Sequence, residues 1–110
     1  MTTTRARIDF RPIYNRNDRL THYTATPIGE GRLIDRTYDG NARYCRRWDF
    51  TCYIEVDYFY LGAPNNIMFR LVTQGRERGG RRYREFRNLA EAMETAEKWA
   101  ARRFAFEIDN

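Results

Sequence analysis

The sequence predicts an α+β fold, an antiparallel β-meander of five or six strands with one C-terminal amphipathic helix packed on one face. Several short segments alternate between apolar and polar residues, which is the period of half-buried strands. One segment near the end instead repeats its apolar residues at the i, i+3, i+4, i+7 spacing of a helical face. With 110 residues, the chain is expected to form a single domain over 1–110.

The first part of the chain predicts three strands separated by turn signals. Segment 5–11 alternates cleanly, and Pro12 is expected to end this strand or to place it at a sheet edge, because proline cannot donate to a β-ladder. Segments 19–26 and 33–38 are rich in residues that favour strands. Asp39-Gly40-Asn41 then predicts the tight turn of a hairpin.

The longest alternating pattern covers 42–60 and predicts a long strand with one oily face. Charged residues interrupt the pattern near Trp48, so a bend or bulge is expected there. Segment 67–74 is predicted to return as the antiparallel partner of this strand, and 81–87 to be the last strand of the meander.

The helix is predicted to begin at Leu89, because the side chain of Asn88 can accept hydrogen bonds from the first unpaired amides. Arg102 and Arg103 come late in the helix, where positive charge suits the helix dipole. Alanines on its apolar face are expected to let the helix lie close to the sheet. The tail 104–108 alternates again and is expected to return as an edge strand.

The composition narrows the class of protein. Twenty basic residues against 15 acidic ones give a formal charge of +5, and 42% apolar residues exclude a disordered tail. Nothing approaches the roughly 18 uncharged residues of a membrane span, and the start of the sequence lacks the apolar core of a secretory signal. The chain is therefore expected to be soluble and cytoplasmic.

The residue inventory argues against catalysis. The sequence has no serine, and His22 and Lys98 are its only histidine and lysine. Cys45 and Cys52 have no neighbouring histidine and would lie on opposite faces of a continuous strand, so we expect neither a metal site nor a disulfide. No cofactor is implied, and the protein is expected not to be an enzyme.

One acidic cluster keeps an enzymatic alternative open. Asp49, Glu55 and Asp57 share one parity beside Arg47, and carboxylates in this arrangement could hold Mg²⁺ for phosphodiester cleavage. The alternating polar residues of a solvated strand explain the same pattern. A Mg²⁺-dependent nuclease therefore stands as the second alternative function.

The strongest candidate for a binding site is the hairpin 75–87. It carries six arginines against two glutamates, and its glycines predict an exposed, flexible tip. Arginine grips phosphate with two parallel hydrogen bonds and stacks on flat rings. Arg46 and Arg47 could extend the basic surface. The predicted contact residues are Arg76, Arg78, Arg81, Arg82, Tyr83, Arg84, Arg87, Arg46 and Arg47.

These features predict a small binding module that contacts nucleic acid or a nucleoprotein complex through its arginine-rich hairpin. The first alternative is an inhibitor from a phage or mobile element, similar in role to an anti-CRISPR protein, that binds an acidic protein surface. An ordinary solvated hairpin is also compatible, and a GC-rich genome alone raises the share of arginine. The sheet face left uncovered by a single helix could support a homodimer.

Overall fold

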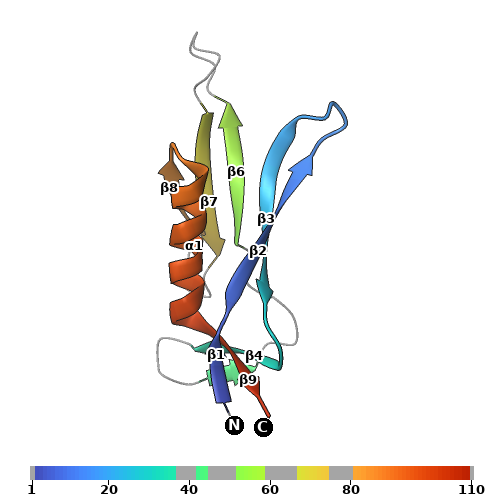
Figure 1. Ribbon diagram of the computed structural model, residues 1–110. Helices are drawn as coiled ribbons and strands as arrows, with labels where there is room; N and C mark the ends of the chain where they lie inside the picture. The colour runs from blue at the N-terminus through green and yellow to red at the C-terminus, as the bar shows by residue number, and fades with distance from the viewer. Residues whose placement is uncertain (1, 37–41, 45–51, 59–66, 75–80, 110) are drawn as a thin grey trace.

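The computed structural model shows two antiparallel sheets and one helix (Figure 1). It describes residues 2–36, 42–44, 52–58, 67–74 and 81–109. In spatial order the larger sheet consists of β2 (Arg7–Tyr14), β3 (Leu20–Ile28), β6 (Cys52–Tyr58), β7 (Ile67–Gln74) and β8 (Arg81–Phe86). The smaller sheet consists of β1 (Thr2–Arg5), β9 (Phe104–Ile108), β4 (Arg32–Arg36) and β5 (Ala42–Tyr44). With helix α1 (Leu89–Arg103), this confirms the predicted α+β fold.

Strand β2 forms one edge of the larger sheet and pairs with β3 through a short turn. Pro12 lies opposite Tyr23 in this edge strand, where its missing N–H costs no ladder hydrogen bond. In the turn, the Asn15 side chain accepts hydrogen bonds from the amides of Asn17 and Arg19. The predicted placement of Pro12 at a sheet edge is therefore confirmed.

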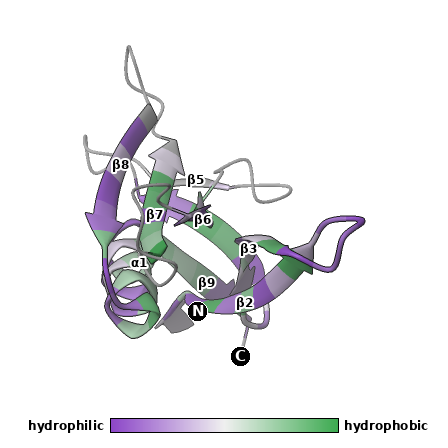
Figure 2. Cartoon of the chain, turned by 90° about the horizontal axis from the view of Figure 1, so that it is seen from above, coloured by the Kyte–Doolittle hydropathy of each residue, from purple (hydrophilic) through white to green (hydrophobic). Residues whose placement is uncertain are grey.

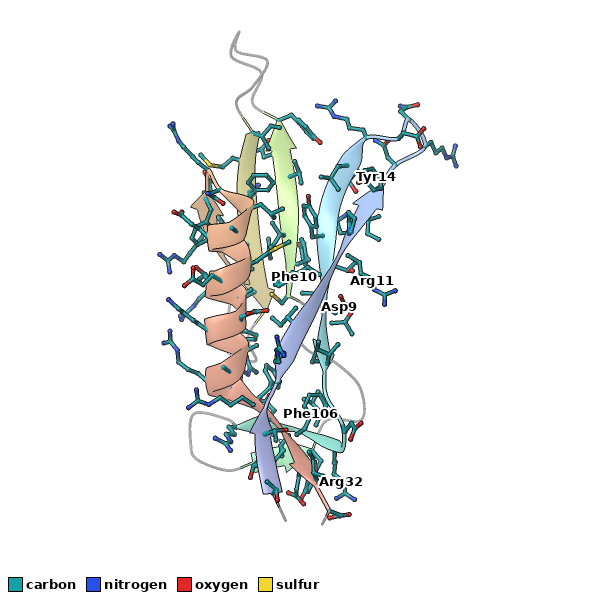
Figure 3. All side chains as sticks on the ribbon, in the orientation of Figure 1. Asp9, Phe10, Arg11, Tyr14, Arg32 and Phe106 are labelled. Atoms are coloured by element: carbon teal, nitrogen blue, oxygen red, sulfur yellow. The ribbon has the colours of Figure 1, made fainter. Side chains whose placement is uncertain are left out.

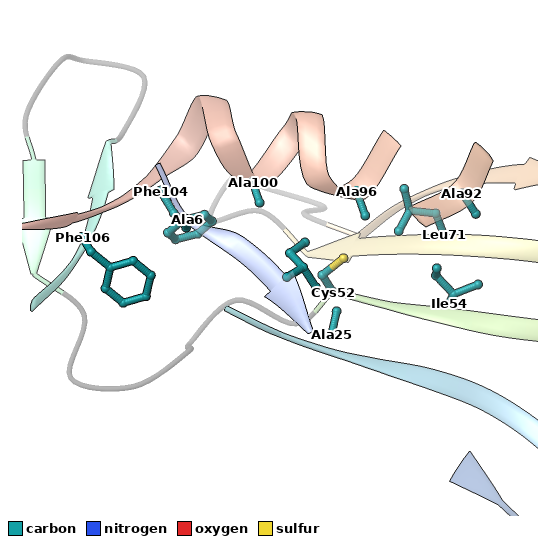
Figure 4. Packing of buried hydrophobic residues seen from close by; sticks show 11 residues of the cluster. Ala6, Ala25, Cys52, Ile54, Leu71, Ala92, Ala96, Ala100, Phe104 and Phe106 are labelled. Carbon is teal, nitrogen blue, oxygen red and sulfur yellow. The ribbon is translucent and has the colours of Figure 1, made fainter. Parts of the chain in front are cut away.

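Helix α1 packs on one face of the larger sheet, and Figure 2 shows the strands curving around it. The side chain of Asn88 caps the helix by accepting a hydrogen bond from the amide of Ala90 at 2.8 Å, as predicted. Three alanines, at 92, 96 and 100, are fully buried against the sheet residues shown in Figure 4. Within the described part of the chain, no helix is long and apolar enough to cross a membrane.

The predicted long strand over 42–60 is wrong as a continuous strand. Strand β5 pairs with β4 in the smaller sheet, whereas β6 pairs with β3 and β7 in the larger sheet. The chain therefore changes sheets between 44 and 52, although the bend predicted near Trp48 lies outside the described residues. The hairpin predicted around Asp39-Gly40-Asn41 agrees with the antiparallel pairing of β4 and β5 on either side.

The tail 104–108 forms strand β9, but its prediction as an edge strand is wrong. Strand β9 lies between β1 and β4, so that Thr2 pairs with Ile108 on one side and Leu33 with Phe106 on the other. The physical reason is a second change of sheet at the buried Ala6, whose amide donates to the carbonyl of Phe104. This change detaches β1 from β2 and supplies β9 with a neighbour.

A buried ion pair joins the smaller sheet to the end of the helix. The guanidinium of Arg103 donates from Nε to Oδ1 of Asp35 at 3.0 Å and from Nη2 to Oδ2 at 3.2 Å. Asp35 is only 1% exposed. Arg103 also lies against the rings of Trp99 and Phe104. Two charges buried here stabilise the fold only as a pair, because neither has water to replace its partner.

Two glycines, Gly29 and Gly31, lie where the chain passes from β3 to β4. A Cβ at Gly29 would collide with the ring of Phe106. Gly31 has φ +96°, and a Cβ there would collide with the backbone carbonyl of Glu107. Only glycine therefore lets this crossing lie directly against β9.

Candidate functional site

The predicted contact residues that the structure describes lie on β8, at the edge of the larger sheet opposite to β2. Arg82, Tyr83, Arg84 and the following Arg87 are all exposed. Tyr83 is 62% exposed, a large fraction for an aromatic residue within a strand. The other predicted contacts, Arg46, Arg47, Arg76, Arg78 and the side chain of Arg81, lie outside the described part of the structure.

The alternation of β8 separates its basic and aromatic residues. Phe86 packs against the core, so Arg84 two residues earlier points to the same side, that of α1, and its guanidinium lies 5.4 Å from the Phe86 ring. Tyr83 and Glu85 point to the opposite side of the sheet, which we call the open face; there both contact Arg70. The structure thus places the arginines at 82 and 84 on one side of the edge and Tyr83 on the other.

The charge of Arg84 and Arg87 is not neutralised by the described part of the chain. Neither guanidinium has a carboxylate within ion-pair distance among the described residues. By contrast, Arg11 is paired with Asp9 (both labelled in Figure 3), and Lys98 with Glu94. We define the β8 edge as Arg82, Tyr83, Arg84 and Arg87; at Arg84 and Arg87 it presents positive charge to solvent.

The open face carries an acidic network around one guanidinium. Arg70 lies 3.3 Å from Glu55, 3.2 Å from Asp57 and 3.5 Å from Glu85, measured between nitrogen and carboxylate oxygen. Partial burial by itself would lower the pKa of Arg70, but its hydrogen bond to Glu55 and the three negative charges raise the pKa overall. Among the described side chains of this network, three carboxylates face one guanidinium, so the network carries an excess of negative charge.

The same network bears on the acidic pair considered for Mg²⁺. The guanidinium of Arg70 lies between Glu55 and Asp57 and donates one hydrogen bond to a carboxylate oxygen of each. Asp49, the third residue of the predicted cluster, lies outside the described residues. Among the residues that the structure does describe, no group of three or more His, Cys, Asp and Glu side chains is placed to hold a metal ion.

A cavity of about 710 Å³ lies along β3, β6 and β7. The hydroxyl of Thr21 lies 2.9 Å from Nδ1 of His22, and the His22 ring meets Tyr53 edge-on. The hydroxyls and carboxylates that line this cavity offer hydrogen-bond partners to a polar molecule. Sequence reasoning missed the cavity, because its walls come from strands far apart in the chain. The lining residues are Thr21, His22, Thr24, Ala25, Cys52, Tyr53, Glu55, Val56, Asp57 and Arg70.

Cys52 is expected to be chemically inert in the folded protein. It is 3% exposed, and burial raises the pKa of its thiol to about 12. Because the thiolate is the reactive form, the folded protein should hold on the order of a thousandfold less reactive Cys52 at pH 8 than the unfolded chain. Labelling a Cys45→Ala variant with an aromatic disulfide reagent, with and without urea, measures this difference. Equal rates in the two conditions would contradict it.

No family model, curated protein or solved structure matches this chain. The function is therefore inferred from the two surfaces just described, the basic β8 edge and the acidic open face. Arg70 is the residue of this region that sequence reasoning did not single out. Its signal is weak in the sequence, because its three acidic partners belong to β6 and β8 and meet it only through strand register.

Proposed function

We propose that the protein is a non-enzymatic binding module that contacts nucleic acid, alone or in a nucleoprotein complex, through the β8 edge. The observation that carries the proposal is the exposure of Arg84 on the edge strand β8 and of Arg87 just after it, neither with a described carboxylate within ion-pair distance. A guanidinium binds a phosphate through two parallel hydrogen bonds and stays charged at any physiological pH.

The edge position adds to this support. A ligand can approach β8 from the side, because no described strand covers its outer edge. The phosphates of a nucleic acid repeat along its backbone, so neighbouring arginines of one strand can contact several of them at once. The helix side of the edge, which holds Arg84, is better suited to phosphates than the open face with its excess of carboxylates.

Salt dependence of binding tests the proposal. If the edge and the adjoining arginines neutralise about four to six phosphates, log K should fall against log salt with a slope of about −4 to −5 on duplex DNA or about −3 to −4 on a single strand. The double variant Arg84→Gln with Arg87→Gln should reduce this slope by roughly 2. Fluorescence anisotropy of a labelled oligonucleotide, titrated at several salt concentrations, gives both values.

The matched control removes the same charge elsewhere. Arg5 in β1 and Arg36 in β4 are exposed residues of the smaller sheet, and Figure 1 shows these strands at the opposite end of the helix from the label of β8. The double variant Arg5→Gln with Arg36→Gln should leave the slope close to that of the wild type. A flat salt response of the wild type, or the same loss in both double variants, would overturn the proposal.

An acidic protein surface is the competing ligand, as an inhibitor of a nuclease complex would need. A pull-down from the native host, performed with and without nuclease, separates the two ligands. A single stoichiometric protein that survives nuclease treatment, together with no binding to oligonucleotides, would replace nucleic acid by an acidic protein as the partner. Loss of the bound material on nuclease treatment supports the proposal.

A further inference from the structure

We infer that the β8 edge binds single-stranded rather than duplex nucleic acid, with one base stacked on the ring of Tyr83. The inference rests on the proposed function and specifies its ligand. It is carried by the position of Tyr83 relative to Arg84 and to the acidic network of the open face.

The ring of Tyr83 presents a flat, exposed surface on the open face. Its side chain is 62% exposed, and the guanidinium of Arg70 lies 5.3 Å from the centre of its ring. Arg70 is itself held by Glu55, Asp57 and Glu85, so it supports the ring from a fixed position. A planar base can cover the exposed part of the ring, and stacking of this kind tolerates any base sequence.

The geometry of the edge restricts which nucleic acid can use this ring. Arg84 points to the helix side of β8 and Tyr83 to the open face. A backbone bound at Arg84 must therefore turn a base over the edge of the strand to reach Tyr83. A single strand can turn its bases outwards, whereas the bases of a duplex are paired and stacked inside the helix.

The acidic network argues in the same direction. A duplex bound at Arg84 carries a second phosphate backbone. Among the described side chains of the Arg70 network, three carboxylates face one guanidinium, and this excess of negative charge repels phosphates. A base carries no charge at neutral pH, and its N–H groups, the ring N–H of thymine included, can donate hydrogen bonds to carboxylates. The open face therefore accepts a base but not a backbone.

The inference is tested by comparing variants of Tyr83 on nucleic acids with and without accessible bases. The ligands are a labelled single-stranded oligothymidine, a duplex of the same length, and an abasic strand that keeps the phosphates. We expect Tyr83→Leu to weaken binding of the oligothymidine about tenfold, within the range for one stacked base. We expect the same variant to leave binding of the abasic strand unchanged, and Tyr83→Phe to bind like the wild type.

The outcomes separate this inference from the proposed function. Equal or tighter binding of the duplex by the wild type, or an equal effect of Tyr83→Leu on the oligothymidine and the abasic strand, would overturn the single-strand inference. If Arg84→Gln with Arg87→Gln still removes binding in those cases, the proposed function stands. If that double variant binds all three ligands like the wild type, the β8 edge is not the site and both proposals fail. A urea titration confirms that each variant is folded.

Discussion

Replacing Asp35 by alanine should lower the free energy of unfolding by about 3–5 kcal/mol, the range for removing one partner of a buried ion pair. The substitution leaves the guanidinium of Arg103, which is only 11% exposed, without the two oxygens that accept its hydrogen bonds. Urea denaturation followed by circular dichroism measures the change.

Two further variants test whether the loss of stability comes from the buried ion pair itself. Asp9→Ala breaks the ion pair with Arg11, which is exposed, and should cost less than about 1 kcal/mol. Asp35→Leu combined with Arg103→Met replaces both charges by apolar groups and should recover much of the lost stability. A loss at Asp35 no larger than that at Asp9 would show that the buried pair does not hold the smaller sheet to the helix.

The second large effect is expected at Gly31. Gly31→Ala should lower the free energy of unfolding by about 3 kcal/mol, combining about 1–2 kcal/mol for a side chain in the left-handed region with about 1–3 kcal/mol for forcing an extra carbon into packed surroundings. The added Cβ meets the carbonyl of Glu107, which is fixed by strand β9 and cannot turn aside as a side chain could. Urea titration again gives the value.

The neighbouring Glu30 supplies the control. It lies between Gly29 and Gly31, is exposed, and should tolerate Glu30→Ala within about 0.5 kcal/mol. An equally small effect at Gly31 would mean that the crossing from β3 to β4 can move away from β9 at little cost. The difference in unfolding free energy between the two variants therefore measures the cost of moving this crossing away from β9.

The features that depend on neighbouring residues were predictable from the sequence. The helix from Leu89 follows from the cap at Asn88 and from alanines at helical spacing, both local properties of the chain. The pairing of β6 with β7 and of β7 with β8 follows from alternation and short connections. Pro12 marks an edge strand for a reason contained in the residue itself.

The features that depend on distant residues were not predictable in this way. Alternation continues across 42–60, and nothing in that pattern shows that its two ends join different sheets. The sequence shows six arginines near β8, but only the packing of Phe86 decides which side of the sheet Arg84 faces. The pairing of Arg70 with Glu55 and Glu85 likewise depends on strand register.

The interior position of β9 has a consequence for how the protein is made. On the ribosome, Thr2–Arg5 is synthesised before its partner strand, and it can pair only after Phe104–Ile108 has emerged. Until then the strand that lies between β1 and β4 is missing. The hairpins of the larger sheet can already close, because each joins two strands that are near in sequence. Because contacts between such distant residues form slowly, the smaller sheet should be completed after the hairpins of the larger sheet have closed.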